Sequence, residues 1–308
     1  MDKKKTYDAG IGWVSSVENV FLSFLKKELR KKKYSFDEVT YENLRHRYDD
    51  IKNDRYAYRV FIDRASFDHP AYFLFADLVQ KKGAYVVNNP DAVIAWGSKT
   101  ALYGALCNAG LPLPRVFLLP ARPPAKKELI HIPKALGVPF ILKPAYGGLV
   151  DDVLLRARTV DDIITFMEDN GTDETLAQEY VVPTVVRKKT AWFRPLYVCG
   201  EVIPLWWDPL SHFYQPFGRS AEERDIAKDL KNMLCRIHDI TGLDLFTTEV
   251  AIDEGGEYKI IDYANHPIDL NSQENASDAL PEDILEDVAR CIAVYIGKIK
   301  AHGNVIRE

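Results

Sequence analysis

The stretch "LFTTEVAIDEGGEYKIIDYANHP", residues 245–267, has the pattern of a β-hairpin. Apolar and polar residues alternate on both sides of a glycine-bearing turn at Asp253–Gly256, which is typical of two antiparallel strands. If the loop has two or four residues, Glu249 and Asp262 share one face, with Cβ atoms about 4.5–8 Å apart. Carboxylates this close repel each other unless a cation lies between them or one of them is protonated. The hairpin therefore predicts a metal site, and an exposed acidic face is the alternative.

Oxygen ligands from few side chains favour Mg²⁺, whose shell is completed by water and phosphate. Asn265 offers a third, neutral oxygen. Strict alternation points it away from Asp262, so it needs a bulge or the end of the strand to reach the ion. The predicted ligands are thus Glu249, Asp262 and Asn265, for Mg²⁺ with Mn²⁺ as a substitute.

A phosphate site is predicted by "PFILKPAYGGLVDDV", residues 139–153. An apolar strand ends there in Lys143, and Gly147 and Gly148 follow in the next loop. Glycine brings backbone amides close to phosphate oxygens, and a lysine adds positive charge. Lys99 begins a helix expected over 99–109 after a Ser98 cap, where only a nearby anion favours a cation. Simple exposure to solvent is the alternative for both lysines.

The composition is that of an ordinary globular protein, with 308 residues, 47% apolar and 28% charged residues, and a net charge of −5. No apolar run is long enough to cross a membrane, and the first residues lack the apolar core of a secretory signal. We therefore expect a cytoplasmic protein without a membrane partner. The basic run at 26–33 stands alone, which argues against nucleic acid, and four dispersed cysteines argue against a disulfide framework or structural zinc.

The order of elements predicts an α/β (α+β) fold. Strands are expected near 9–15 and 58–63, and helices near 17–32 and 70–83. Further along, Ser220 and Glu223 form a capping box for a helix that Gly242 ends, and the last helix is expected near 281–300.

Seven segments in this order resemble the ATP-grasp superfamily, in particular carboxylate–amine ligases similar to the ribosomal-protein glutamate ligases. They lie between residue 88 and about residue 270 and read "NNP…K", "AGLPLPRV", "PFILKPAYGG", "LAQEYVVP", "RPLYVCGEVIP", "TEVAID" and "IIDYAN". The resemblance implies an ATP-grasp fold after a small α/β pre-ATP-grasp domain. The implied parts are residues 1–87 (the first domain), 88–120 (connecting helix and strand), 121–183 (lid subdomain with the glycine loop) and 184–308 (C-terminal subdomain with the metal site).

The resemblance also implies a role for each matching residue. Lys99 and Lys143 would contact the nucleotide phosphates, and the loop with Gly147 and Gly148 would close over them. Arg194 would stabilise negative charge on the transferring phosphoryl and acyl groups. The segment bordering adenine would be Gln178, Glu179, Tyr180 and Val181, and Mg²⁺ would be held by Glu249, Asp262 and Asn265.

The implied reaction is an ATP-dependent ligation. A carboxylate attacks ATP to form an acylphosphate, which an amine or a thiol then attacks, leaving ADP and phosphate. Three departures from the family pattern stand against full activity: Trp192 replaces a common aspartate, Asp262 and Asn265 are one residue further apart than usual, and Leu149 and Val150 follow the glycine pair. A small-molecule kinase and a non-catalytic nucleotide-binding regulator are the alternatives.

The expected partners are small-molecule or peptide carboxylate and amine substrates, and a homodimer is the default for a soluble enzyme. Candidate substrate contacts are Arg64 and Ser66 in the first domain, and His212 and Arg219 in the loop 206–219. Packing within the protein is the alternative for the aromatic residues of that loop.

Overall fold

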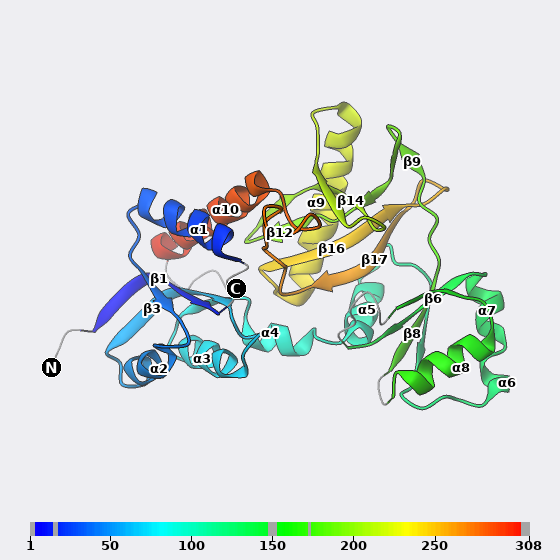
Figure 1. The fold of residues 1–308 in the computed structure, drawn as a ribbon, viewed down its shortest axis with the longest axis horizontal. Helices are drawn as coiled ribbons and strands as arrows, with labels where there is room; N and C mark the ends of the chain where they lie inside the picture. The colour runs from blue at the N-terminus through cyan, green and yellow to red at the C-terminus, as the bar shows by residue number, and fades with distance from the viewer. Residues whose placement is uncertain (1–3, 15–17, 147–152, 172–173, 303–308) are drawn as a thin grey trace. The chain divides into compact units, whose positions relative to one another are not determined.

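The computed structural model describes residues 4–14, 18–146, 153–171 and 174–302. Two compact units divide these residues. Unit 1 comprises 1–93, 194–247 and 265–308, and unit 2 comprises 94–193 and 248–264. Figure 1 shows the ribbon of both, and each unit is described by itself.

Unit 1 contains a parallel four-stranded sheet in the order β2-β1-β3-β4. Its strands are β1 (Lys5–Trp13), β2 (Phe36–Val39), β3 (Tyr56–Arg64) and β4 (Tyr85–Val87). Parallel sheets need cover on both faces, and four helices supply it: α1 (Asn19–Lys31) and α10 (Glu282–His302) on one face, α2 (Leu44–Lys52) and α3 (Pro70–Lys81) on the other (Figure 1). The helices predicted near 17–32, 70–83 and 281–300 are confirmed.

Helix α10 closes the first domain although it comes from the end of the chain. It packs against α1, β1 and β3. Its residues at helical spacing are buried almost completely, including Val288, Ile292, Ile296 and Ile299. Residues 1–87 therefore share their core with the last helix.

The rest of unit 1 is built from short antiparallel strands and one long helix. β12 (Leu196–Val198) pairs with β13 (Glu201–Ile203) and with the first residues of β16 (Leu245–Ile252), and β14 (Leu205–Asp208) pairs with β15 (Phe213–Pro216). Helix α9 (Ala221–Thr241) begins at the predicted capping box. The hydroxyl of Ser220 accepts from the amide of Glu223, and Gly242 ends the helix in the left-handed region.

Unit 2 contains an antiparallel sheet in the order β5-β8-β6-β7. Its strands are β5 (Val116–Leu119), β6 (Phe140–Pro144), β7 (Leu154–Ala157) and β8 (Thr175–Glu179). Helices α7 (His131–Leu136) and α8 (Val160–Asp169), with the single turn α6 (Lys126–Leu129), share an apolar core with Phe140 and Leu142 of β6. Because side chains alternate along a strand, Ile141 and Lys143 point to the opposite face.

Unit 2 also holds α5 (Lys99–Asn108) and most of the predicted hairpin. β17 (Tyr258–Asn265) pairs with β16, and so does β11 (Trp192–Phe193). Its remaining strands are short: β9 (Val185–Val186) and β10 (Lys189–Thr190). The short helix α4 (Pro90–Ala95) spans the boundary between the two units. Within the described residues, no helix combines the length and the apolar character that crossing a bilayer requires.

Candidate functional site

Lys143 lies on the face of the β6–β8 sheet that the helices leave uncovered. Its side chain is only 6% exposed, and its ammonium group donates to the carbonyl of Ile261 in β17 at 3.0 Å. Asp262 Oδ1 lies 4.0 Å from this nitrogen, and the ring centre of Tyr263 lies 4.7 Å from it. Asp262 and Tyr263 are adjacent in β17, so their side chains point to opposite faces of the strand. The ammonium group of Lys143 therefore lies at the edge of β17, within reach of the Asp262 carboxylate and the Tyr263 ring.

The turn of the hairpin differs from the prediction. The amide of Asp253 donates to the carbonyl of Glu257 at 2.9 Å, so the loop has three residues, with Gly256 at φ +81°. The expected loop of two or four residues is therefore wrong. Further along the hairpin, the hydroxyl of Thr248 donates to the carbonyl of Asp262. That Glu249 and Asp262 share one face stays a prediction.

The two lysines and the two acids nevertheless act on one another. Burial lowers the pKa of Lys143, the positive charge of Lys99 lowers it as well, and the negative charges of Asp262 and Glu249 raise it. Lys99 is tied to the same strand end, since its amide donates to the carbonyl of Ala145 at 2.8 Å. Ser98 caps α5 as predicted. Four charged side chains of unit 2 thus form one electrostatic cluster.

Glu249 is held by Trp192, which stood out in the sequence only as a departure from the family pattern. The indole Nε1 of Trp192 donates to Glu249 Oε2 at 3.2 Å. Trp192 stands opposite Ala251 in the β11–β16 pair, and Glu249 lies two residues before Ala251 on the same face of β16. A tryptophan reaches such a diagonal neighbour.

Next to Lys143, β8 presents the segment predicted to border adenine. Gln178 stands opposite Ile141 and is buried, and its Oε1 accepts from the hydroxyl of Tyr263 at 3.2 Å. Val181 is buried with Ala251 and Ile261. Tyr180 is 40% exposed, and Glu179 pairs with Arg115.

The charged residues fit a hard divalent cation by the chemistry of their donors. The side chain of Asp262 is 26% exposed and Glu249 is partly buried, so both carboxylates remain accessible to an ion. Water or phosphate could then supply the other oxygen ligands of that ion. Among the described residues, no group of three or more His, Cys, Asp or Glu side chains is arranged to hold a metal. An ion at this place would therefore take two protein carboxylates and complete its shell from other sources.

Other predicted site residues lie elsewhere or outside the described residues. Gly147 and Gly148 fall outside the described ranges. Asn265 ends β17 and, like Arg194, belongs to unit 1. In that unit, the Arg194 guanidinium lies 4.7 Å from the ring centre of Trp207, on which His212 stacks.

Among the remaining candidates for substrate contact, the side chains of Arg64 and Ser66 already bond to protein groups within unit 1. Arg64 is buried and donates to Glu18 and to the carbonyl of Ile268 at 2.6 Å. Ser66 donates to Asp63. The carbonyl of Arg219 accepts from Arg224 at 2.6 Å. For Arg64, a substrate contact would first have to replace an ion pair.

Two contributors were missed at the level of sequence, namely Trp192 and Tyr263. Tyr263 follows Asp262 directly, and its fully buried ring packs beside Tyr103, with ring centres 5.6 Å apart. An aromatic residue inside an apolar strand is ordinary, so no local signal distinguishes it. The bond of Trp192 depends on strand register, which local sequence does not show.

Searches with sequence-family models find no match to this chain. Its structure, however, is similar throughout to ATP-grasp ligases. The ligase PsnB, solved with the precursor peptide PsnA2 and AMPPNP, has a TM-score of 0.63 at 15% identity, covering 95% of this chain and 99% of that one; it has also been solved with a minimal precursor, Mg and ADP.

Two further structures give the same result. The D-cycloserine synthetase DcsG has a TM-score of 0.63 at 13% identity, covering 94% of this chain and 99% of that one. A RimK domain ATP-grasp protein from Sphaerobacter thermophilus has a TM-score of 0.60 at 14% identity, covering 93% and 99%. Likeness along nearly the whole length shows the architecture that the resemblance implied: the chain has the ATP-grasp fold.

Proposed function

We propose that the protein is an ATP- and Mg²⁺-dependent ligase that joins a carboxylate to an amine or a similar nucleophile through an acylphosphate. The observation that carries the proposal is the cluster of charges around Lys143 in unit 2. Asp262 lies 4.0 Å from its buried ammonium group, and the charges of Lys99 and Glu249 act on the same group. Such a cluster is costly for stability alone and suits a ligand that carries both phosphate and metal.

In this proposal the two lysines contact the phosphates of ATP, whose negative charge would compensate the buried ammonium group of Lys143. Glu249 and Asp262, with Asn265, hold Mg²⁺, which would neutralise charge on the phosphates. Gly147 and Gly148 cover the nucleotide, and Arg194 stabilises charge on the transferring groups. Gln178, Glu179, Tyr180 and Val181 border the adenine. The protein positions reactants and neutralises charge, and no side-chain nucleophile is needed.

The substrates are a carboxylate and an amine of a peptide or a small molecule. The peptide complex of PsnB and the D-cycloserine synthetase are neighbours of about equal similarity. They support the ligase class and do not choose between these substrates.

The test is ADP release with pooled amino acids and peptides, followed by hydroxylamine trapping. We expect ATP-dependent formation of a hydroxamate, and at least a roughly 100-fold loss of turnover in Asp262→Asn with the fold retained. Asp287→Asn, an exposed acid of α10, is the matched control and should keep full turnover. A phosphorylated product without hydroxamate would identify a kinase, and no nucleotide turnover with any acceptor would leave a binding protein.

A further inference from the structure

The bond between Trp192 and Glu249 places an indole N–H on one of the proposed metal ligands. Nε1 donates to Oε2 at 3.2 Å, and neither side chain is fully exposed. A carboxylate oxygen that accepts such a bond has one lone pair fewer for a metal.

The indole is a fixed donor because its strand and its ring are both held. Backbone bonds tie β11 to its neighbours, from Ile252 to Ala191 at 3.0 Å and from Ala191 to Thr184 at 2.8 Å. The ring packs against a buried cluster formed by Val181, Ala251 and Ile261. A donor held this way fixes the orientation of the carboxylate it binds.

We infer that Trp192 is a positioning residue, which holds Glu249 so that it binds Mg²⁺ through one oxygen. The inference rests on the proposed function and deepens it. Ca²⁺ accepts carboxylates through both oxygens in a large, flexible shell, whereas Mg²⁺ requires a compact octahedral one. Chelation through both oxygens has to compete with the indole bond, so Trp192 makes the site prefer Mg²⁺ over Ca²⁺.

Two tryptophans make a matched experiment. Trp192→Phe removes the indole N–H from Glu249, and Trp206→Phe removes an equivalent bond, from Trp206 Nε1 to Glu223 Oε1 at 3.1 Å, in unit 1. Calorimetry would measure ADP binding to the full chain in Mg²⁺, in Ca²⁺ and in EDTA. Mn²⁺ titration followed by electron paramagnetic resonance gives a second readout that does not depend on activity.

We expect the wild type and Trp206→Phe to share the same preference for Mg²⁺ over Ca²⁺ in ADP binding. In Trp192→Phe this preference should narrow about five- to tenfold, because Glu249 can then chelate through both oxygens. Trp192→Leu, whose side chain also has no hydrogen-bond donor, repeats the test if the Phe variant does not fold.

An unchanged ratio of Mg²⁺ to Ca²⁺ in the Trp192 variants would overturn the inference and leave the proposed function standing. An equal shift in Trp206→Phe would also overturn it, because the effect would then be general. ADP binding by the wild type that ignores all divalent ions would overturn the proposed metal site and the inference together.

Discussion

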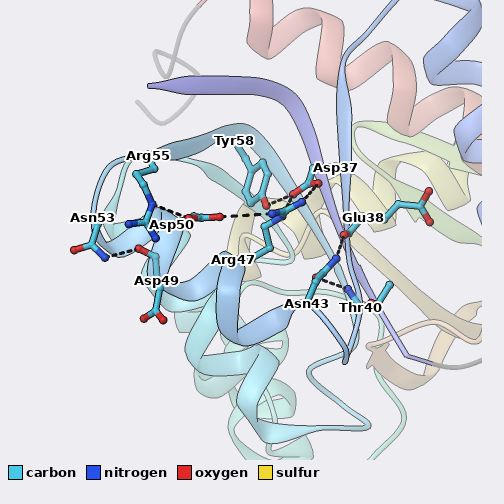
Figure 2. Close-up of polar contacts among 10 residues, drawn as sticks. All are labelled: Asp37, Glu38, Thr40, Asn43, Arg47, Asp49, Asp50, Asn53, Arg55 and Tyr58. Carbon is cyan, nitrogen blue, oxygen red and sulfur yellow. Dashed lines mark hydrogen bonds and ion pairs between the residues drawn. The ribbon is translucent and has the colours of Figure 1, made fainter. Parts of the chain in front are cut away.

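Two pairs of a cation and a carboxylate can be compared in this protein, one in each unit, and each has one buried member, Asp37 in the first and Lys143 in the second. In unit 1, the Arg47 guanidinium donates twice to Asp37, at 2.6 and 2.9 Å, and Tyr58 donates to the same carboxylate at 2.7 Å (Figure 2). In unit 2, the ammonium group of Lys143 lies 4.0 Å from Asp262 and donates to a backbone carbonyl.

The two pairs also differ in how well the protein stabilises the positive charge. The bonds to Asp37 raise the pKa of Arg47, so the folded state stabilises that cation. Burial lowers the pKa of Lys143, so its charge is poorly compensated. Figure 2 shows a closed network in which Asp50 joins Arg47 to Arg55. A closed pair supports the fold, and an imperfectly compensated one is typical of a site that receives a ligand.

Arg47→Met should be the most destabilising change. It leaves Asp37 buried without its cation, and the free energy of unfolding should fall by about 3 kcal/mol. Urea denaturation measures the loss, and ADP affinity measured by calorimetry on the folded variant should be unchanged. Stability within about 0.5 kcal/mol of the wild type would show that the network in Figure 2 is not structural.

Lys143→Met should have the opposite profile. Removing a poorly compensated buried charge should leave stability equal or raise it by up to about 1 kcal/mol, because the methionine fills similar space. ADP affinity should fall about 30-fold with the loss of a charge-assisted contact to phosphate. A variant that binds ADP normally but unfolds more easily would make Lys143 a structural residue like Arg47.

Glu223 is a carboxylate that, like Asp37, is fully bonded within the protein, and its contribution to stability should depend on pH. Its carboxylate accepts from the amide of Gly218, from Trp206 and from Ser220, and these bonds lower its pKa from 4.5 to about 2. A depressed pKa stabilises the fold above the unfolded value, and this contribution is lost as pH falls from about 4.5 towards 2. Glu223→Gln should cost about 1 kcal/mol at pH 7 and flatten the stability profile in that window.

Denaturation of wild type and Glu223→Gln between pH 7 and pH 2.5 checks this expectation. Asp287→Asn, which removes a half-exposed ion pair with Arg290, is the control. It should change the free energy of unfolding by less than about 0.5 kcal/mol and leave its pH dependence unchanged. Parallel profiles for wild type and Glu223→Gln would mean that the capping carboxylate contributes no pH dependence.

Tyr263→Phe should have the smallest effect of this series. It removes the hydroxyl bonded to Gln178 but keeps the ring beside Lys143. Stability should fall by about 0.5–1 kcal/mol, and ADP affinity less than about threefold. A loss of affinity close to that of Lys143→Met would show that the hydroxyl itself organises the nucleotide site.

The sequence predicted helix ends correctly where a single residue determines the local structure. The caps at Ser98 and Ser220 and the stop at Gly242 follow from short-range hydrogen bonds and a left-handed residue. Lys143 at its strand end was also visible, because an apolar run with one terminal lysine stands out.

Features that depend on distant or exact pairing were missed or wrong. Strand β2 and helix α2 escaped notice because "FDEV" and "LRHRYDDIK" carry little apolar periodicity. The turn after Asp253 has three residues, where two or four were expected. Helix α10 covers the first sheet, and no local pattern predicts which sheet a terminal helix will join. The division into four parts and the roles of the site residues stay predictions.

The most direct test of the central claim is calorimetry of ADP binding with Mg²⁺ and with EDTA, for wild type and Asp262→Asn. We expect wild-type binding to weaken at least about tenfold without Mg²⁺, and the variant to bind weakly and equally in both buffers. Equal binding by wild type and variant, with or without Mg²⁺, would contradict a metal–nucleotide site at Asp262.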